Sequence, residues 1–472
     1  MCDIHHQEIK GLLLNARHFH FVIDLVLFLA EQNLLIRGHC ENYSQSAKDS
    51  SDNMGNFLEM HKFILKYSPD IAKAYRNAKY KMLSPKIQND ILQAAAIALV
   101  HEIKIELMDS YYWILAEETR DSCSNELVAV CLRYLHKGNI HERAVGFVDC
   151  SSDLSAEGNS NSILLILEQL ELDPDKCVGF GFDGASVMSG NTGGVQAIVR
   201  RTYIRASYVH CHSHRLNLSL QHVATKDEDL KILDAAECCT KTLQSHSLAL
   251  DSVVEFINGL RDLLIMYRSE EYFFEVFKLT DELHLNSKSQ LEIPELKEYT
   301  KTDVRSVEDL KIIWHDLDDN LLGEIDRRFS EDSMSSFHCT HNIPNRNNYC
   351  ESELTQRFNM IIPESEAIMF NAFSQRSLVE TPTLLDLTSI CNPNIFDNIS
   401  KLLNILVVCP VTTICVERLF STVNLIHSSH RASMLTTRLC NLSLLSFETD
   451  ITKKLQETPL IVEKVMRKMV KK

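Results

Sequence analysis

The sequence lacks three features that would assign it quickly to a class of protein. Its 15 cysteines include no Cys-x-x-Cys pair, so no zinc site built from spaced thiolate pairs is predicted. No apolar run reaches the ~18 residues that a membrane-spanning helix needs. The first residues are polar and charged, unlike an apolar secretory segment. We therefore expect no membrane contact, and we expect reduced, mostly buried thiols in an intracellular protein.

Positive charge is also scarce. The chain has 48 Lys and Arg against 64 Asp and Glu, a formal net charge of −16. This balance argues against a nucleic-acid footprint over the whole surface, but it is compatible with a local basic groove. Residues 464–472 form a basic stretch, and a solvated helix end is the favoured interpretation of it.

The chain does have the composition of a globular protein with a sizeable core. Its 472 residues and hydrophobic fraction of 45% fit about two to four domains. Apolar residues at helical spacing predict helices within residues 12–35, 57–67 and 84–108, the last beginning at Ser84-Pro85. The polar segment 39–56 between them is predicted to be a loop.

Five apolar runs predict strands at residues 111–116, 127–135, 144–149, 176–182 and 206–211. Short connections join the first three runs, as in a meander. Helices expected at 159–170, 195–201 and 212–223 separate or follow the later runs, as in crossover connections. This order predicts an α/β fold with a ribonuclease-H-like core, a mixed five-stranded sheet with helices.

No strand periodicity is evident between residues 225 and 400, where apolar helical stretches alternate with polar segments such as 330–350. Pro410 then marks a break before two amphipathic helices. We predict five parts: a helical N-terminal region (1–108), the first part of the core (109–224), an all-helical insertion (225–400), a C-terminal segment completing the core (401–450) and a basic tail (451–472).

Two acidic residues occupy positions with chemical meaning in such a sheet. Two-metal phosphoryl transfer needs several carboxylates converging on ions about 3.5–4 Å apart, and magnesium prefers oxygen ligands. In a ribonuclease-H-like sheet one acid sits on the first strand and another just after the fourth. Glu117 directly follows the first predicted strand, and Asp183 follows the fourth at a Gly-bearing turn. An isolated Asp before Gly is usually a turn residue. Only the order of these acids in the strand pattern supports a role in metal binding.

Several dispersed segments together resemble the hAT transposase superfamily, in particular the branch of zinc finger MYM-type protein 1-like and 52 kDa repressor of the inhibitor of the protein kinase-like proteins. The segments are Arg37-Gly38-His39, residues 55–59, residues 84–89, residues 115–121, residues 131–134, residues 181–190, residues 210–218 and residues 415–421.

The resemblance implies an acid triad of Glu117, Asp183 and Glu417, which would bind magnesium in an active enzyme. The family has Asp at the first position, whereas this chain has Glu117. Glu is one methylene longer, and a metal site tolerates only about 0.5 Å of misplacement. Asp121, four residues on, belongs to the following turn. We therefore expect a vestigial site without a cofactor.

The pair Cys211-x-x-His214 also matches a family motif. A zinc site is one interpretation, but a structural zinc needs four ligands, usually from two spaced pairs. No second spaced pair is evident, so the favoured role is to fix the turn between a strand and a helix.

The resemblance implies that the C-terminal segment is a dimerisation region. Its apolar residues fall on helical faces: Val416, Leu419, Phe420, Val423 and Ile426 on one helix, and Leu439 and Leu442 on the next. These faces could close the core of one chain, pack against a second chain, or do both.

The N-terminal zinc-binding module with which the family reads DNA has no counterpart in the Cys and His spacing here. We expect a degenerate or domesticated transposase-like protein that forms a homodimer or higher homo-oligomer, binds DNA weakly if at all, and acts in the nucleus as a binding or regulatory factor. An active magnesium-dependent DNA transposase is the alternative, and a decaying element without a selected role is a third.

Overall fold

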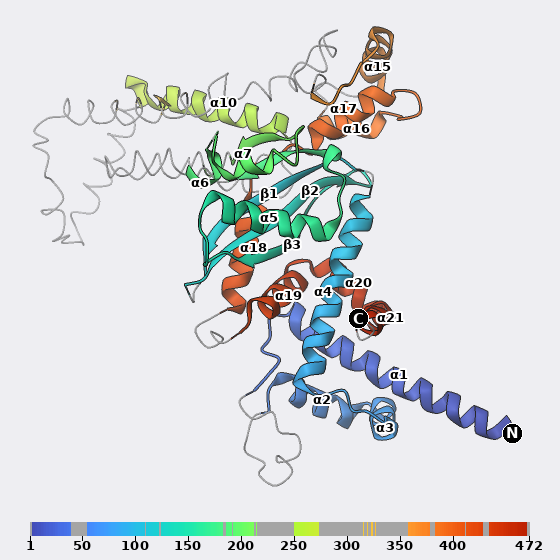
Figure 1. Ribbon diagram of the computed structural model, residues 1–472. Coiled ribbons are helices and arrows are strands. Elements are labelled where there is room, and N and C mark those ends of the chain that lie inside the picture. Colours follow the sequence, from blue (N-terminus) through green and yellow to red (C-terminus); the bar gives the residue numbers. More distant parts are fainter. Residues whose placement is uncertain are drawn as a thin grey trace, which may run out of the picture. The chain divides into compact units, whose positions relative to one another are not determined.

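A five-stranded mixed sheet organises the part of the chain shown in cyan and green in Figure 1, a computed structural model. Its strands are β1 (Tyr112–Arg120), β2 (Glu126–His136), β3 (Asn139–Asp149), β4 (Cys177–Phe182) and β5 (Ser207–His210), in the order β3-β2-β1-β4-β5. β2 pairs antiparallel with both β1 and β3, and β4 pairs parallel with β1. The predicted α/β fold with a ribonuclease-H-like sheet is confirmed.

The structure describes residues 2–38, 54–108, 110–121, 124–182, 186–190, 192–211, 214, 250–272, 357–377, 383–410, 412–427 and 434–469, with single residues between 315 and 326. The chain divides into two compact units, Met1–Tyr208 with Thr413–Lys472, and Val209–Thr412. The predicted loop 330–350, all of the predicted helix 212–223 except His214, and most of the predicted loop 39–56 lie outside the described residues.

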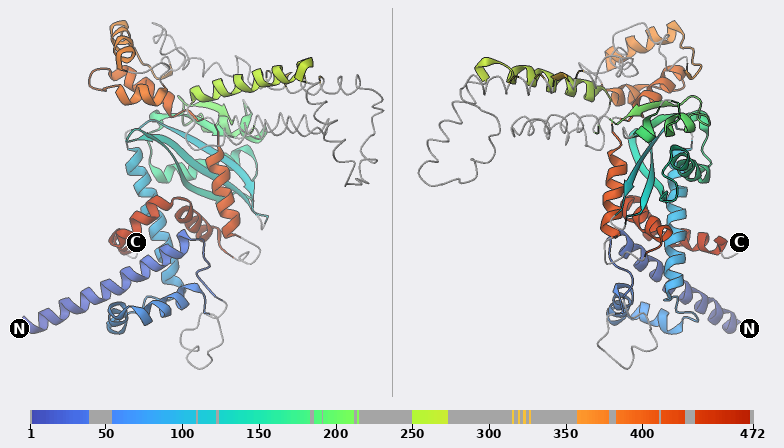
Figure 2. Two further views of the ribbon diagram at one scale, coloured as in Figure 1. Left: turned by 180° about the vertical axis from the view of Figure 1, so that it is seen from behind. Right: turned by 60° about the vertical axis from the view of Figure 1, so that its left-hand side comes forward.

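Helices cover both faces of the sheet. Strand β2, which lies between β3 and β1, is buried from Leu127 to Tyr134, so side chains on both of its faces are covered. Helix α18 (Ile414–Ile426) packs on β1, β2 and β3, whereas α5 (Ala156–Leu170) packs on β2 and β3 from the other side (Figure 2). Three short helices, η1 (Pro174–Lys176), α6 (Ser186–Ser189) and α7 (Val195–Val199), belong to the connections around β4.

The first and last helices of the chain form a helical layer together. It contains α1 (Cys2–Glu31), α2 (Asn56–Tyr67), α3 (Pro69–Asn77), α4 (Pro85–Leu107), α19 (Thr436–Phe447), α20 (Thr449–Glu457) and α21 (Pro459–Met469). Both α1 and α4 pack on α19, α20 and α21. α4 begins where the sequence predicts, with the Ser84 hydroxyl accepting from the Ile87 N–H and a proline in the first turn. The sequence analysis did not predict α3.

Residues 451–472, which the sequence suggested as a basic tail, include most of α20 and all of α21. Ile451, Leu455 and Val462 are buried in the core of this unit. Lys454 forms an ion pair with Glu102 of α4. Basic residues in this stretch therefore lie on helices that pack against the N-terminal region.

Eight described cysteines are free thiols, and six of them are buried. Burial raises the pKa of the Cys177 thiol, and it raises the pKa of Cys440 to about 11. Thiols with raised pKa values are poor nucleophiles, because the thiolate is the reactive form. These cysteines therefore act as small apolar residues.

The unit from Val209 to Thr412 contains described helices α10 (Leu250–Tyr267), α15 (Glu364–Ser377), α16 (Leu384–Ile390) and α17 (Asp397–Val407). α16 starts with a capping box between Thr383 and Asp386, and Arg268 of the segment after α10 pairs with Asp319 at 2.6 Å. Within the described residues, no helix has the length and apolar character needed to cross a membrane.

Two buried histidines face each other where α1 meets α2. His18 and His61 are fully buried, and their Nε2 atoms lie 3.3 Å apart. The Tyr75 ring packs against both imidazoles. Burial lowers the pKa of each histidine to about 4, and for His61 the neighbouring His18 lowers it further. The pair is therefore neutral in the folded protein, with one ring able to donate its proton to the other.

This pair predicts a loss of stability in mild acid. Because the folded-state pKa is below the unfolded value of 6.5, the stabilisation is present above pH 6.5 and is lost as the pH falls towards 4. Between pH 7.5 and pH 5 we expect the wild type to lose about 4 kcal/mol of unfolding free energy, about 2 kcal/mol for each histidine, relative to a His18→Leu/His61→Leu variant. Urea denaturation at both pH values measures this difference.

The exposed His101 on α4 provides the matched control, because His101→Leu should follow the wild type at both pH values. Asp24 and Glu448, whose pKa values burial raises to about 6 and about 7, are present in all three proteins and cancel in the comparison. Equal pH dependence of the wild type and the double variant would contradict the prediction.

Candidate functional site

Strand β1 directs its two consecutive acids to opposite faces of the sheet. Successive side chains of a strand alternate between faces. Glu117 contacts Thr413 at the start of α18, on one face. Glu118 accepts a hydrogen bond of 2.7 Å from the Asn159 amide of α5, on the other face. Only Glu117 therefore lies on the side of the sheet where α18 carries Glu417.

Glu117 is buried, with 6% of its surface exposed, and its carboxylate accepts a hydrogen bond from the Thr413 hydroxyl. Thr413 is the N-cap residue of α18. The unpaired N–H groups at a helix start favour a nearby negative charge, so the carboxylate suits this position. Glu417 lies in the first turn of the same helix and is half-buried. The structure thus places the α18 turn that carries Glu417 next to Glu117.

Asp183, the remaining member of the proposed triad, lies outside the described residues. The preceding part of β4 is described, and its pairing with β1 ends at Ala116 and Phe182. The end of β4 is therefore adjacent to Glu117 in the sheet, which is the neighbourhood that the acid order in the sequence implied. Among the described residues, no group of three or more His, Cys, Asp or Glu side chains could hold a metal ion.

A second acid of the β1 region holds the other end of α18. Asp121, directly after β1, is buried and lies on the same face as Glu117, four residues earlier. Its Oδ2 atom lies 2.8 Å from Nδ1 of His427, the C-cap residue of α18. Its Oδ1 atom accepts from the Asn125 N–H at 2.8 Å. The sequence predicts Asp121 in the turn after the first strand, but it gives no sign of this contact, because about 300 positions separate Asp121 from His427.

The seven residues predicted to mediate dimerisation all lie in the hydrophobic core of their own unit. Val416, Leu419, Phe420, Val423, Ile426, Leu439 and Leu442 are between 0% and 6% exposed. The five residues on α18 form a face that covers β1, β2 and β3. The two leucines lie on α19, which packs on β3 and α4. In a single chain these side chains complete the core.

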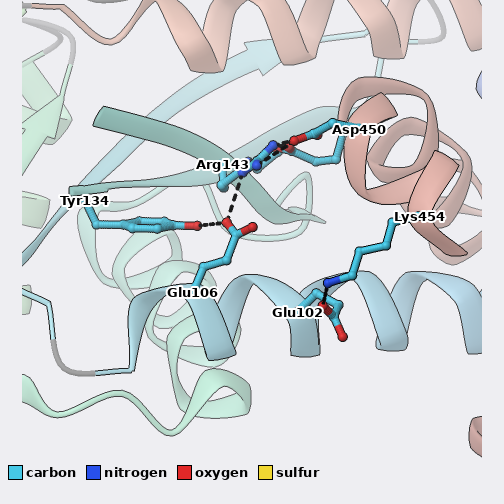
Figure 3. Close-up of polar contacts among 8 residues, drawn as sticks. Glu102, Glu106, Tyr134, Arg143, Asp450 and Lys454 are labelled. Carbon is cyan, nitrogen blue, oxygen red and sulfur yellow. Dashed lines mark hydrogen bonds and ion pairs between the residues drawn. The ribbon is translucent and has the colours of Figure 1, made fainter. Parts of the chain in front are cut away.

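An arginine of β3 ties the sheet edge to the C-terminal helices (Figure 3). Arg143 donates to Asp450 through two nitrogens at 2.7 Å and to Glu448 at 2.8 Å. The second Glu448 oxygen accepts from the Ala144 N–H at 2.6 Å. The pKa of Glu448 is raised to about 7, because burial raises it more than the neighbouring Arg143 lowers it. Because both oxygens accept from N–H donors, the ionised carboxylate suits this site.

Glu106 of α4 extends this cluster. It accepts a 2.8 Å hydrogen bond from the Tyr134 hydroxyl of β2 and lies 3.5 Å from Arg143 Nε. The guanidinium therefore links β3 to α4 and to the junction of α19 and α20. We call Arg143, Glu106, Glu448 and Asp450 the arginine clamp.

Cys211 and His214 lie close together in the other unit. The His214 N–H donates to the Cys211 sulfur at 3.4 Å, and the His210 and His214 rings are 6.0 Å apart. The contact lies directly after β5. The role of the pair in fixing the turn between strand and helix stays a prediction. Residues 212 and 213 lie outside the described residues.

The strand order, the buried acid on β1 and the helix that it anchors define the class as an α/β protein with a ribonuclease-H-like fold. The family model described as ZMYM1/FAM200, RNase-like domain (DUF4371) matches residues 3–194. This match is consistent with a ZMYM/hAT-derived family. The matched region contains Glu117 and Asp183 and ends before Glu417.

The arginine clamp predicts a large loss of stability on substitution. Arg143→Met leaves the buried Glu448 without its charge partner, and we expect about 3–5 kcal/mol less unfolding free energy. Urea denaturation followed by circular dichroism measures the change. Arg17→Met is the matched control, because Arg17 and Asp70 are more than half exposed and such pairs contribute about 0–1 kcal/mol. Equal effects of the two substitutions would contradict the assignment.

Proposed function

We propose that this chain is a transposase-derived protein without DNA-cleaving activity, which self-associates through its C-terminal region and acts in the nucleus as a binding or regulatory factor. The observation that supports this proposal is the state of Glu117. Its carboxylate is buried and bonded to Thr413, so it serves to anchor α18.

The substitution of Glu for Asp fits this structural role better than a catalytic one. The longer side chain moves the carboxylate by about one methylene, more than the roughly 0.5 Å that an organised metal site tolerates. The same length lets Glu117 reach the N-cap hydroxyl of α18. Two described carboxylates, Glu117 and Glu417, do not by themselves make a two-metal site, and we assign no reaction step to them.

The second candidate function is DNA strand cleavage and transfer by Glu117, Asp183 and Glu417 with magnesium. It is favoured by the placement of the start of α18 beside Glu117 and by the end of β4 beside Ala116. In that case the three carboxylates would bind the ions that polarise the attacking and leaving oxygens.

Self-association requires side chains other than the seven core residues. Leu425 at the end of α18 and Leu435 at the start of α19 are 70% and 77% exposed. Large exposed apolar residues can contribute to protein contact sites. We propose that these two leucines contribute to the contact between copies.

The two functions are separated by a nicking and strand-transfer assay on duplex DNA with magnesium or manganese. For the wild type we expect no metal-dependent product, and the same for Asp183→Ala. A Glu117→Asp variant, which restores the residue of the family pattern, tests whether this position alone limits activity. Metal-dependent product from the wild type that disappears in Asp183→Ala would overturn the non-catalytic proposal.

Light scattering of the full chain tests self-association. We expect a dimer or larger assembly for the wild type and a shift to monomer for Leu425→Glu/Leu435→Glu, because two charges would have to be desolvated in the contact. Leu460→Glu on α21, at a position that is 49% exposed, is the matched control and should assemble normally. A monomeric wild type would contradict self-association.

A further inference from the structure

The negative net charge of the chain is concentrated in one unit. Residues 209–412 have 18 Lys and Arg against 33 Asp and Glu, which is close to the whole excess of acidic residues. The segment from residue 54 to residue 86, in the other unit, has seven basic residues and two acidic ones. The overall charge of −16 therefore conceals a basic region formed by α2, α3 and the connection to α4.

Both acidic residues of this segment are already paired. Glu59 lies 3.7 Å from Lys62 on α2, and Asp70 lies 3.2 Å from Arg17 on α1. Six further basic side chains of this segment are exposed: Lys66, Lys73, Arg76, Lys79, Lys81 and Lys86. A face with mixed charges would be an ordinary solvated surface, whereas an excess of one sign in an acidic chain indicates an anionic partner.

Three large aromatic side chains are exposed among these basic residues. Phe63, Tyr67 and Tyr80 are 58%, 74% and 64% exposed. Phe63 and Tyr67 are neighbours on the outer face of α2, with ring centroids 5.0 Å apart, and Lys66 lies on the same face. The opposite face of α2 buries Phe57, Leu58 and His61, so the core does not require the outer aromatics.

We propose that the outer faces of α2 and α3, with the connection at residues 79–81, bind single-stranded nucleic acid. Lys66, Lys73 and Arg76 pair with phosphates, and the faces of Phe63, Tyr67 and Tyr80 stack on unpaired bases. Basic side chains interleaved with exposed aromatic rings are the chemistry that binds single strands without sequence preference. A duplex hides its base faces, so it could use only the basic residues.

Fluorescence anisotropy of a labelled 20-nucleotide single strand with the full chain, between 50 and 200 mM salt, tests the proposal. Phe63→Ala/Tyr67→Ala should weaken binding by about fivefold or more per stacked base, with an unchanged salt slope. Lys66→Gln/Lys73→Gln/Arg76→Gln should weaken binding and lower the slope of log K against log salt by about 2, since each phosphate contact on a single strand contributes about 0.7.

The matched control is Phe373→Ala/Arg376→Gln/Lys401→Gln in the acidic unit, where an exposed aromatic residue and two exposed basic residues should have no effect on binding. Thermal melting checks that every variant is folded. Absence of binding by the wild type at 50 mM salt, normal binding by the aromatic variant, or tighter binding of a duplex than of the single strand would each overturn the proposal. The readout is independent of DNA cleavage, so failure here leaves the non-catalytic function untouched.

Discussion

The alternation of side chains along β1 is the constraint on which the rest of the ribonuclease-H-like unit depends. Glu117 and Asp121 lie on the same face because they are four residues apart on an extended chain. One contacts the N-cap of α18 and the other contacts its C-cap. A carboxylate suits the positive end of a helix, and at the other end the Asp121 carboxylate contacts the helix through the His427 imidazole. These two contacts fix the position of α18 along the sheet, and its apolar face then completes the core.

The sequence predicted the parts of this fold that are encoded locally. Uninterrupted apolar runs indicated the five strands, and Ser84-Pro85 gave the start of α4, because strand burial and helix caps involve residues close together in the chain. The packing of α20 and α21 against α1 and α4, and the contacts of Arg143 with Glu448 and of His427 with Asp121, join residues about 300 positions apart. Such pairings are decided by the tertiary arrangement and leave no pattern in a single sequence.

The candidate site shows the same division. The acids on β1 and after β4 could be found from their order in the strand pattern, as could Glu417 from the resemblance of its helix. The hydrogen bond between Glu117 and Thr413 could not be predicted from the sequence. Thr413 matters only because it lies at the start of α18. The charge of the whole chain likewise gave no sign of the basic segment around α2 and α3, because the acidic residues of the other unit outweigh it.

The helical layer also constrains how the chain reaches its native state during synthesis. The apolar faces of α1 and α4 are completed by α19, α20 and α21, and residues 436–469 leave the ribosome long after the N-terminal helices. Until then α1 and α4 expose apolar surface, which in a large protein favours association with chaperones or aggregation. Contacts between residues so far apart in sequence also form slowly. Folding of this unit is therefore expected to finish only after α19, α20 and α21 have been synthesised.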